Sequence, residues 1–512
     1  MKKRLIAIII PVLAVCLAVI LFSCADSSGN TENNNNINNN NNANNAENIS
    51  GDGVVAADDI SVDTTKESIP PIALPEENYG GRNFNVITRP FDMTTQIFYM
   101  FASEEENGDL INDALYKRTV TIEERYNVKI NQITSDGPAQ AARKSVKADD
   151  DNYNLVEELG WAGFPLANEG MVVNMYDVPY VSEAMAENKP WWDRALARDM
   201  TINGKLYFNA GDIVMYDDIL VYVILFNKEL FANNAIEYPY QYVHDGTWTY
   251  DKMFSLTRGL NKDINGDGVL DEFDQWGIMG EYHSSGRLFQ SSGQTSIAIG
   301  DDGYPYFALE EPRAIDVMNK LMPYIVDGES MLLAEKIKKP KTESVYSEMA
   351  VYFQEDRLFM WLATLGNVTR GNLRAMKTDF GIIPTPKYNE FQDKYYTFVE
   401  MSASIVSVPI TADLNFTGHI AEALAYESVS TLTPAFYDLT LQTKTARDDE
   451  SEAMLDIIFN NKIYDLGTFN TNFLVHDIFP TAVSTKGGDM VSLIESKKDA
   501  INAAIEKFNQ NY

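Results

Sequence analysis

An acidic stretch at residues 263–274 has the residue types and spacing of a calcium-binding loop. Oxygen-bearing side chains stand at its first, third, fifth, ninth and twelfth positions, and a main-chain carbonyl at the seventh would add a ligand. These expected ligands are Asp263, Asn265, Asp267, Val269, Asp271 and Asp274. Gly268 stands at the sixth position, where the chain must turn sharply. The pattern predicts a structural Ca²⁺ site, with an affinity weakened because the Asp274 side chain is shorter than the usual glutamate. A metal-free acidic turn is the alternative.

A second group of side chains follows two predicted strands. Arg89, Phe91 and Asp92 come after the first strand, and Glu158 and Trp161 come after the second. If both strands belong to a parallel sheet, these loops lie at the edge where such sheets bind ligands. Aromatic rings with carboxylate and guanidinium groups suit a small ligand that has apolar ring faces and hydroxyl groups, such as a sugar. We expect a binding site here; a core tryptophan and ordinary surface polarity are the alternatives.

The elements that must position these residues alternate between strand and helix patterns. In chain order we expect a strand at 84–88, a helix at 110–125, a strand at 128–133, a helix at 139–147 and a strand at 153–156. Further strands are expected at 219–226, 380–383, 395–399 and 404–408, and helices at 421–430, 451–459 and 491–508. The β-α-β-α-β order predicts an α/β fold with a parallel sheet covered by helices on both faces.

The N-terminus has the order of charge and hydropathy that is typical of a secretion signal. Three basic residues precede an apolar run at 5–22, which ends on Ser23 and Cys24 and resembles the lipobox of bacterial lipoproteins. Residues 1–23 are therefore expected to be a signal peptide, with Cys24 lipidated and anchoring the chain to the cell membrane. An uncleaved membrane anchor is the alternative, because the apolar run approaches the length of about 20 residues that spans a bilayer.

Composition limits the partners of the chain. Its 41 Lys and Arg residues against 74 Asp and Glu give a formal net charge of −33, so nucleic acid and anionic lipid headgroups are poor partners. The chain has only two cysteines, Cys16 in the signal and Cys24, so a mature form cannot close an internal disulfide. The polar, Asn-rich composition of residues 24–75 predicts a disordered tether, and the remaining length is enough for a large apolar core.

Several short motifs occur in a fixed order along the chain. They are Asn154-Leu155-Val156, Gly170-Met171-Val172-Val173, Lys189-Pro190-Trp191-Trp192, Ile202-Asn203-Gly204-Lys205-Leu206-Tyr207, Leu225-Phe226-Asn227-Lys228 and Asp379-Phe380-Gly381-Ile382-Ile383-Pro384-Thr385-Pro386-Lys387. With the lipoprotein-like start, they resemble the signatures of family 1 extracellular solute-binding proteins. The resemblance extends from residue 83 to the end of the sequence. It implies a maltose-binding-protein-like fold of the periplasmic binding protein type, with two α/β lobes, a multi-strand hinge and a ligand cleft between the lobes.

The family layout implies non-contiguous lobes. The first lobe would hold residues 80–222 and 400–445, and the second residues 223–399 and 446–512. Several segments that cross together would form a hinge that opens without unravelling the chain.

The same layout adds further ligand residues. Asp217 and Asp218 would lie just before the crossing strand, with Glu400 and Ser402 in the returning segment. Carboxylates beside a buried strand are costly unless they are paired or serve a ligand, although a solvated turn is the alternative for one residue of each pair. Trp361 stands where maltose-binding-like proteins place an aromatic ring, but the small residues that accompany that ring are absent here.

The resemblance implies a monomeric lipoprotein on the outer face of the cell membrane. It would capture a small solute, a mono- or oligosaccharide, and deliver it to the permease subunits of an ABC importer. The competing functions are a lipid-anchored glycan-active hydrolase and a glycan-binding surface protein without an importer; peptides, polyamines and other small polar solutes also remain as ligands. No Gly-x-Ser-x-Gly elbow, spare cysteine or glycine-rich phosphate loop is present, so we expect no enzyme.

Overall fold

The computed structural model describes residues 70–90, 100–342, 344–369, 373, 376–442 and 449–510. The predicted signal peptide, Cys24, most of the predicted tether, and Phe91 and Asp92 lie outside these ranges. Within the described ranges, no helix is both long and apolar enough to cross a bilayer. The end of the predicted tether differs from expectation, because the apolar side chains of Ile72 and Leu74 are partly buried and pack against the core.

Four strands form the first sheet, in the order β12, β3, β1 and β2. Their bounds are β1 (Arg82–Thr88), β2 (Val128–Thr134), β3 (Leu155–Leu159) and β12 (Ser404–Ser407). β1 runs parallel to β2 and β3, whereas β12 is antiparallel to β3. The helices α1 (Leu110–Tyr126) and α2 (Pro138–Lys147) connect the parallel strands, which confirms the expected β-α-β-α-β order. The segments that follow β1, β2 and β3 therefore leave the sheet at one common edge.

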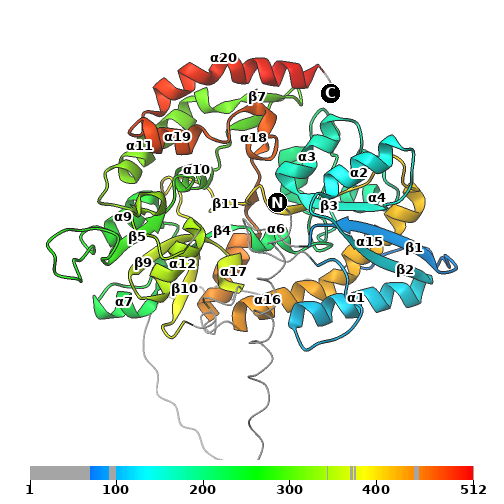
Figure 1. Cartoon of the computed structure of the whole chain (residues 1–512), viewed down its shortest axis with the longest axis horizontal. Coiled ribbons are helices and arrows are strands. Elements are labelled where there is room, and N and C mark those ends of the chain that lie inside the picture. The colour runs from blue at the N-terminus through cyan, green and yellow to red at the C-terminus, as the bar shows by residue number, and fades with distance from the viewer. Residues whose placement is uncertain are drawn as a thin grey trace, which may run out of the picture. The chain divides into compact units, whose positions relative to one another are not determined.

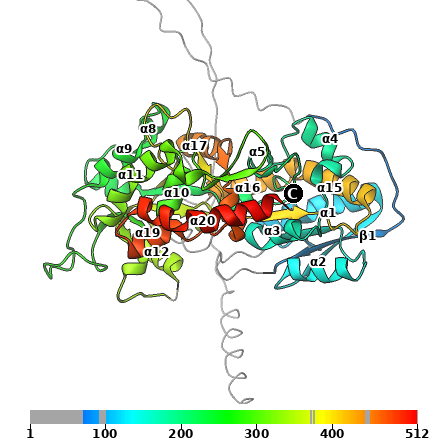
Figure 2. The same ribbon diagram turned by 90° about the horizontal axis from the view of Figure 1, so that it is seen from above.

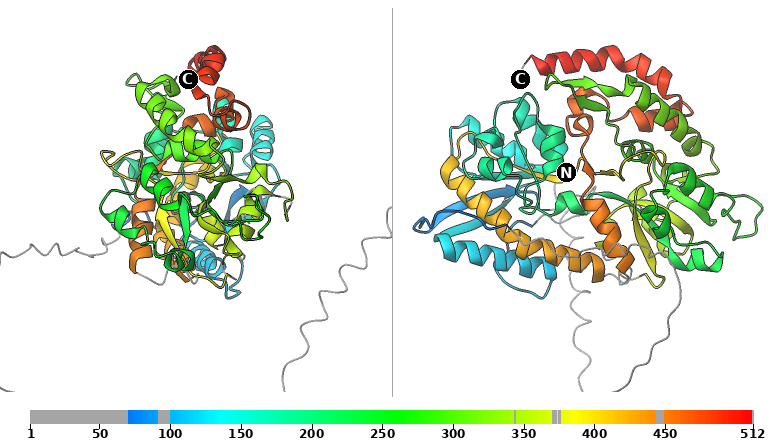
Figure 3. Two further views of the ribbon diagram at one scale, coloured as in Figure 1. Left: turned by 90° about the vertical axis from the view of Figure 1, so that its left-hand side faces the viewer. Right: turned by 180° about the vertical axis from the view of Figure 1, so that it is seen from behind.

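Five strands form the second sheet, in the order β10, β4, β9, β5 and β8. They are β4 (Tyr222–Asn227), β5 (Trp276–Gly280), β8 (Leu332–Leu333), β9 (Leu358–Thr364) and β10 (Phe380–Pro384). β5 is parallel to β8 and β9, and β4 is antiparallel to β9 and β10. The described residues of the two sheets lie on opposite sides of the folded part (Figure 1), and the view from behind agrees (Figure 3). Seen from above, α9, α11 and α12 lie on one side, and α1, α2 and α15 lie on the other (Figure 2).

Helices cover both sheets. The helices associated with the first sheet include α3 (Gly160–Asn168), α4 (Val181–Ala186), α5 (Arg194–Met200), α6 (Tyr216–Ile219), α15 (Leu414–Ser430) and α16 (Leu432–Gln442). Those of the second sheet include α7 (Lys228–Asn233), α8 (Tyr240–His244), α9 (Tyr250–Thr257), α10 (Ser284–Gln290), α11 (Pro312–Val326), α12 (Val345–Gln354), α13 (Gly366–Thr369), α17 (Asp449–Phe459), α19 (Ile478–Thr485) and α20 (Met490–Asn509). Helix α18 (Leu466–Phe469) packs against α3. The α/β fold class is confirmed.

Several short segments connect the two sheets. β11 (Thr397–Phe398) runs parallel to β13 (Lys462–Ile463), and an isolated bridge pairs Val221 with Val399. A small hairpin of β6 (Ile297–Ile299) and β7 (Pro305–Phe307) packs against α20. These crossing segments match the expected multi-strand connection, while the exact residue bounds of the two lobes stay a prediction.

Helix α20 also reaches the helices of the first sheet. The ring of Phe508, in its last turn, lies 5.0 Å from the ring of Phe473 and 6.4 Å from the ring of Phe164 in α3, measured between centroids. Phe164 in turn packs against Phe208 at 5.2 Å. An apolar contact therefore joins α20 to the helix that carries Trp161.

Three local expectations need correction. Trp161 lies in the first turn of α3 and not in a loop, because the helix begins directly where β3 ends. The strand expected from residue 219 begins at Tyr222, because Ile219 belongs to the short helix α6. β11 is only two residues long, since its partner β13 offers only two residues for pairing.

Gly160 sits where a side chain has no room. A Cβ atom there would lie 2.2 Å from the Phe469 ring and 2.9 Å from the carbonyl oxygen of Met401. We predict that Gly160→Ala lowers the free energy of unfolding by about 1–3 kcal/mol, because α3 must shift to relieve the overlap. Chemical denaturation measures the change. Gly137→Ala is the control, since its new Cβ would meet its nearest atom at an ordinary 3.6 Å; equal stability of the two variants would contradict the prediction.

Candidate functional site

Residues 400–403 bring the ends of strands from both sheets together. The main-chain N–H of Gly160 donates to the carbonyl of Ala403 at 2.9 Å, and the N–H of Trp161 donates to that of Met401 at 3.1 Å. At the other end of the segment, the N–H of Glu400 donates to the carbonyl of Leu220 at 2.9 Å. The main chain of Trp161, in the first turn of α3, is thereby held beside the segment that begins at Glu400. The indole side chain of Trp161 is 39% exposed, which is unusual for so large an apolar group.

Glu400 forms a buried ion pair with Arg287 of α10. The Arg287 Nη2 atom lies 2.6 Å from Glu400 Oε2, and the two side chains are only 6% and 12% exposed. The Tyr222 hydroxyl donates to the same carboxylate oxygen at 3.3 Å. The guanidinium carbon lies 5.2 Å from the Tyr222 ring centroid and 4.9 Å from that of Phe398. Burial alone would lower the pKa of Arg287, but Glu400, Tyr222 and Glu281 together outweigh burial and raise it.

A second charged pair lies at the edge of the first sheet. Arg89 donates through Nε and Nη2 to Glu158 Oε1, at 3.1 and 2.9 Å. The Glu158 carboxylate also accepts the main-chain N–H groups of Ala139 at 3.2 Å and Leu159 at 2.9 Å. These bonds tie the segments after β1 and β2 to β3. Two of the expected ligand residues thus lie together beside Trp161, already bonded to each other.

Asp217 and Asp218 belong to an ion cluster at the crossing segments. The Lys462 ammonium lies 2.8 Å from Asp217, 2.9 Å from Asp218 and 2.6 Å from Asp193. Tyr464 donates its hydroxyl to Asp193 at 2.8 Å. Burial raises the pKa of Asp217 well above its usual value although Lys462 opposes this, and the three carboxylates raise the pKa of Lys462. The structure therefore uses these two aspartates to hold β13 against α5 and α6.

The other two residues drawn from the family layout lie in different surroundings. Trp361 is on β9 in the middle of the second sheet, where it is 1% exposed and its ring centroid lies 5.8 Å from that of Phe353. Because helices cover the sheet, the Trp361 ring presents no surface to a solute. Ser402 is buried within the segment that holds Trp161 and Glu400. Whether any of the expected residues touches a ligand stays a prediction.

The acidic loop closes on itself through its carboxylates. Asp263 accepts the N–H groups of Gly266 at 2.6 Å and Gly268 at 2.8 Å, and these bonds lower the pKa of Asp263. Gly268 has φ +81°, the left-handed conformation that the sixth position requires. Asp274 is buried and accepts the N–H of Ile264 at 3.0 Å. The carboxylates of Asp263 and Asp274 thus bond main-chain N–H groups of the loop itself. In the described part of the chain, no three acidic side chains of this loop lie within 4.8 Å of one another, and a bound ion stays a prediction.

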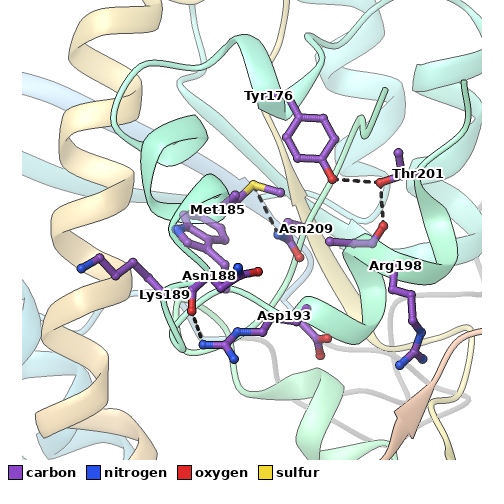
Figure 4. A pocket seen from close by; sticks show the side chains of 11 residues that line it. Tyr176, Met185, Asn188, Lys189, Asp193, Arg198, Thr201 and Asn209 are labelled. Carbon is purple, nitrogen blue, oxygen red and sulfur yellow. Dashed lines mark hydrogen bonds between the residues drawn. The ribbon is translucent and has the colours of Figure 1, made fainter. Parts of the chain in front are cut away.

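Two pockets of about 400 and 390 Å³ flank helix α5. Tyr176, Met185, Asn188, Lys189, Trp192, Asp193, Arg194, Ala197, Arg198, Thr201 and Asn209 line the first (Figure 4). The second pocket lies between Arg198 and Asp199 of α5, strand β6 and Tyr396. None of the residues expected from sequence to bind the ligand lines either pocket.

Sequence reasoning missed the main basic residue of this region. Arg287 follows β5, a strand that was not expected, on the first helix after its carboxyl end. Arg89 and Trp161 were chosen because they follow the carboxyl end of a strand. Glu281 and His283 follow the end of β5 in the same way, but β5 was not predicted. Lys462 gave no local signal, since its carboxylate partners are at least 244 residues away along the chain.

Comparison with solved structures identifies the fold. A sugar transporter protein from Rhizobium etli, solved in an open conformation, aligns with a TM-score of 0.53 and 13% identity over 82% of this chain and 99% of its own. A cyclo/maltodextrin-binding protein complexed with maltotetraose aligns with a TM-score of 0.51 and 12% identity over 84% and 97%. The maltose/maltodextrin-binding domain MalE from Bdellovibrio bacteriovorus, bound to maltotriose, gives 0.50 and 13% over 83% and 100%.

These similarities define a class of fold. The chain has the fold of periplasmic binding proteins of the maltose-binding type, as the motifs implied. No protein-family model and no curated protein matches the chain by sequence.

Glu157 of β3 is a buried acid two residues before the end of that strand. Its Oε1 atom accepts the Ser404 hydroxyl at 3.0 Å, and Arg118, itself buried, is the basic residue that interacts with it. Burial raises the pKa of Glu157 to about 7, despite these opposing effects. The folded chain therefore keeps a proton here that the unfolded chain loses near pH 4.5.

The sign of the pH dependence follows. The contribution of Glu157 to stability is complete below about pH 4.5 and is lost as the pH rises through 7, at a total cost of about 3 kcal/mol. We predict that Glu157→Gln flattens the fall in unfolding free energy between pH 5 and 8. Denaturant titrations across that range measure the slope. Glu124→Gln, on the exposed face of α1, should keep the wild-type slope; an unchanged slope in Glu157→Gln would disprove the assignment.

Proposed function

We propose that this chain is a family 1 extracellular solute-binding protein that captures a mono- or oligosaccharide. The observation that carries the proposal is the exposed ring of Trp161, whose main chain bonds the segment that begins at Glu400. Glu400 pairs with Arg287, and Glu158, three residues before Trp161, pairs with Arg89. The fold supports it, because two of the aligned proteins were solved with maltotriose and maltotetraose.

The chemistry of these groups suits a sugar. The flat indole face of Trp161 can pack against the C–H face of a pyranose ring, while guanidinium and carboxylate groups bond the hydroxyl groups at its rim. Because both arginines are already paired with carboxylates, the edge offers donors and acceptors without a large net charge. A neutral polyhydroxylated ligand fits that balance better than an ion of either sign.

The carboxylates near Trp161 suit binding better than catalysis. A glycosidase needs one carboxyl group that is protonated and a second that is free to act as nucleophile or base. Glu158 and Glu400 are instead each bonded to an arginine, and Glu158 also accepts two main-chain N–H groups. The proposal is therefore capture without chemical conversion, with a glycan-active hydrolase as the competing function.

Delivery completes the proposed role. The signal-like start and Cys24 support a lipid-anchored protein on the outer face of the cell membrane. The polar residues that follow would let the folded part reach the ABC permease subunits while it remains attached. Two strand ends that share one ligand would close on the solute by a hinge motion at the crossing segments. A glycan-binding surface protein without an importer remains the alternative to delivery.

Removal of the exposed ring tests the sugar site. We predict that the protein binds at least one sugar from a panel of monosaccharides and malto-oligosaccharides, and that Trp161→Ala weakens that binding by about tenfold or more, equal to about 1.4 kcal/mol. Isothermal titration calorimetry gives the affinity. Phe391→Ala, which removes a 96% exposed ring that is not among the expected ligand residues, is the matched control.

The same samples separate binding from hydrolysis. Chromatography of each sugar after incubation should return it unchanged. Formation of shorter sugars would favour the hydrolase. Absence of any sugar binding, or full affinity in Trp161→Ala, would reject the proposed site.

We also propose that the loop at residues 263–274 binds Ca²⁺ as a structural ion. Support comes from the inward-facing carboxylates of Asp263 and Asp274 and from the left-handed Gly268. Arg357 further fixes the loop, since its guanidinium donates to the carbonyl oxygens of Glu272 and Asp274. An ion there would join β5 more tightly to the strand β9 that follows Arg357.

Calcium should therefore stabilise the folded chain. After treatment with a chelator, millimolar Ca²⁺ is expected to raise the melting temperature by about 1–3 °C, because the ion binds only the closed loop. Differential scanning calorimetry measures the shift. Asp267→Asn should abolish the shift, and Asp301→Asn, in an exposed turn outside the loop, should retain it. A chain that melts at the same temperature with and without calcium would refute the calcium site.

A further inference from the structure

Two of the four histidines of the chain stack on one another at the end of the second sheet. His283 follows β5 and immediately precedes α10, and His476 immediately precedes the turn into α19. Their ring centroids lie 5.0 Å apart, with 30° between the ring planes. The pair forms because α10 and α19 pack closely: a Cβ atom on Gly286 would already lie 3.4 Å from the Phe479 ring. Residues almost 200 apart in sequence thus present two imidazoles side by side.

A carboxylate completes the group. Asp477 follows His476, and one ligand atom from each of His283, His476 and Asp477 can be chosen so that all three lie within 4.8 Å of one another. Within the described ranges, this is the sole group of three histidine, cysteine, aspartate or glutamate side chains found close enough to share a metal ion. The Asp477 side chain is 82% exposed, so it is free to rotate toward an ion held by the two rings.

One buried ring nitrogen of the pair lacks a protein partner among the described residues. His476 Nδ1 is buried and has no hydrogen-bond partner among the described residues. Its Nε2 atom is 3.9 Å from Asp477 Oδ1, beyond hydrogen-bonding distance. A buried ring nitrogen without a partner carries a free-energy cost that a coordinated metal ion would remove.

We propose that His283, His476 and Asp477 bind a divalent transition-metal ion, with Zn²⁺ as the representative. Two imidazoles and one carboxylate are a common zinc ligand set, and three protein ligands leave a fourth position open for water or another oxygen. The spread of 4.8 Å must shorten when the ion binds, and rotation of the exposed Asp477 and of the ring of His283 would allow this. Imidazole ligands also separate this site from the all-oxygen calcium loop, because Ca²⁺ prefers oxygen.

The surrounding charges permit a cation. Arg287 stands one turn after His283 and opposes a positive ion, but it is paired with Glu400 at 2.6 Å and also interacts with Glu281. Glu400 and Glu281 thus offset the charge of Arg287, and Asp477 supplies a further negative charge to the group itself. The site adjoins the Arg287–Glu400 pair, yet its existence does not depend on the proposed sugar binding.

Zinc titration of the untagged mature chain tests the proposal. With 1 mM Ca²⁺ present to fill the acidic loop, isothermal titration calorimetry is expected to give one zinc ion per chain, at micromolar or tighter affinity. His283→Ala and His476→Ala should each weaken binding by about tenfold or more. His244→Ala is the matched control, because His244 pairs with Glu450 on the surface and takes no part in the group.

Two further measurements keep the result decisive. Asp477→Asn alters only an exposed side chain, so it should fold normally and still weaken zinc binding. Co²⁺ should give visible absorption bands of a low-coordinate nitrogen and oxygen site, which both histidine variants lose. No zinc binding, or equal binding in His283→Ala and His244→Ala, would overturn the proposal. Because no sugar is used, either outcome leaves the proposed solute binding to its own test.

Discussion

The arrangement of the crossing segments depends on one buried ammonium group. Lys462 lies within 2.9 Å of three aspartates, which come from α6 and from the residue before α5. Burial of so many charges is costly, and loss of any one partner would leave an unpaired ion in the interior. The cluster therefore fixes β13 in one position. β11, paired with β13, is fixed with it, and Glu400 follows β11 by two residues.

The binding edge follows from that position. Because β11 is held, residues 400–403 can bond to Leu220 on one side and to Gly160 and Trp161 on the other. Arg287 then meets Glu400 from the second sheet, and Arg89 meets Glu158 from the first. Main-chain hydrogen bonds between distant segments thus bring the residues of the proposed sugar site together. Ion pairs hold its polar side chains in place before a ligand binds. Such preorganisation reduces the entropy lost on binding.

Local pattern predicted the first sheet well. The strands and helices from β1 to β3 have regular apolar spacing and short connections, so sequence alone located them within a few residues. Trp161 and Glu158 were expected in the loop after the third strand, but Glu158 lies inside β3 and Trp161 in the first turn of α3, because both elements extend into the expected loop. Trp361 and Asp217 show the limit of local pattern. The sequence gives the residue types, but the burial of Trp361 and the pairing of Asp217 with Lys462 depend on segments that are more than 100 residues away along the chain.

The contact of Phe508 with Phe164 has a consequence for the energetics of domain motion. Rotation of the first sheet away from the second would have to part these rings and wet apolar surface that is now shielded. The conformation described here therefore carries its own resistance to opening, independent of any guest. Because a ligand shifts a conformational equilibrium only by its difference in affinity for the two states, the energy of this ring contact adds to the free energy that any opening must supply.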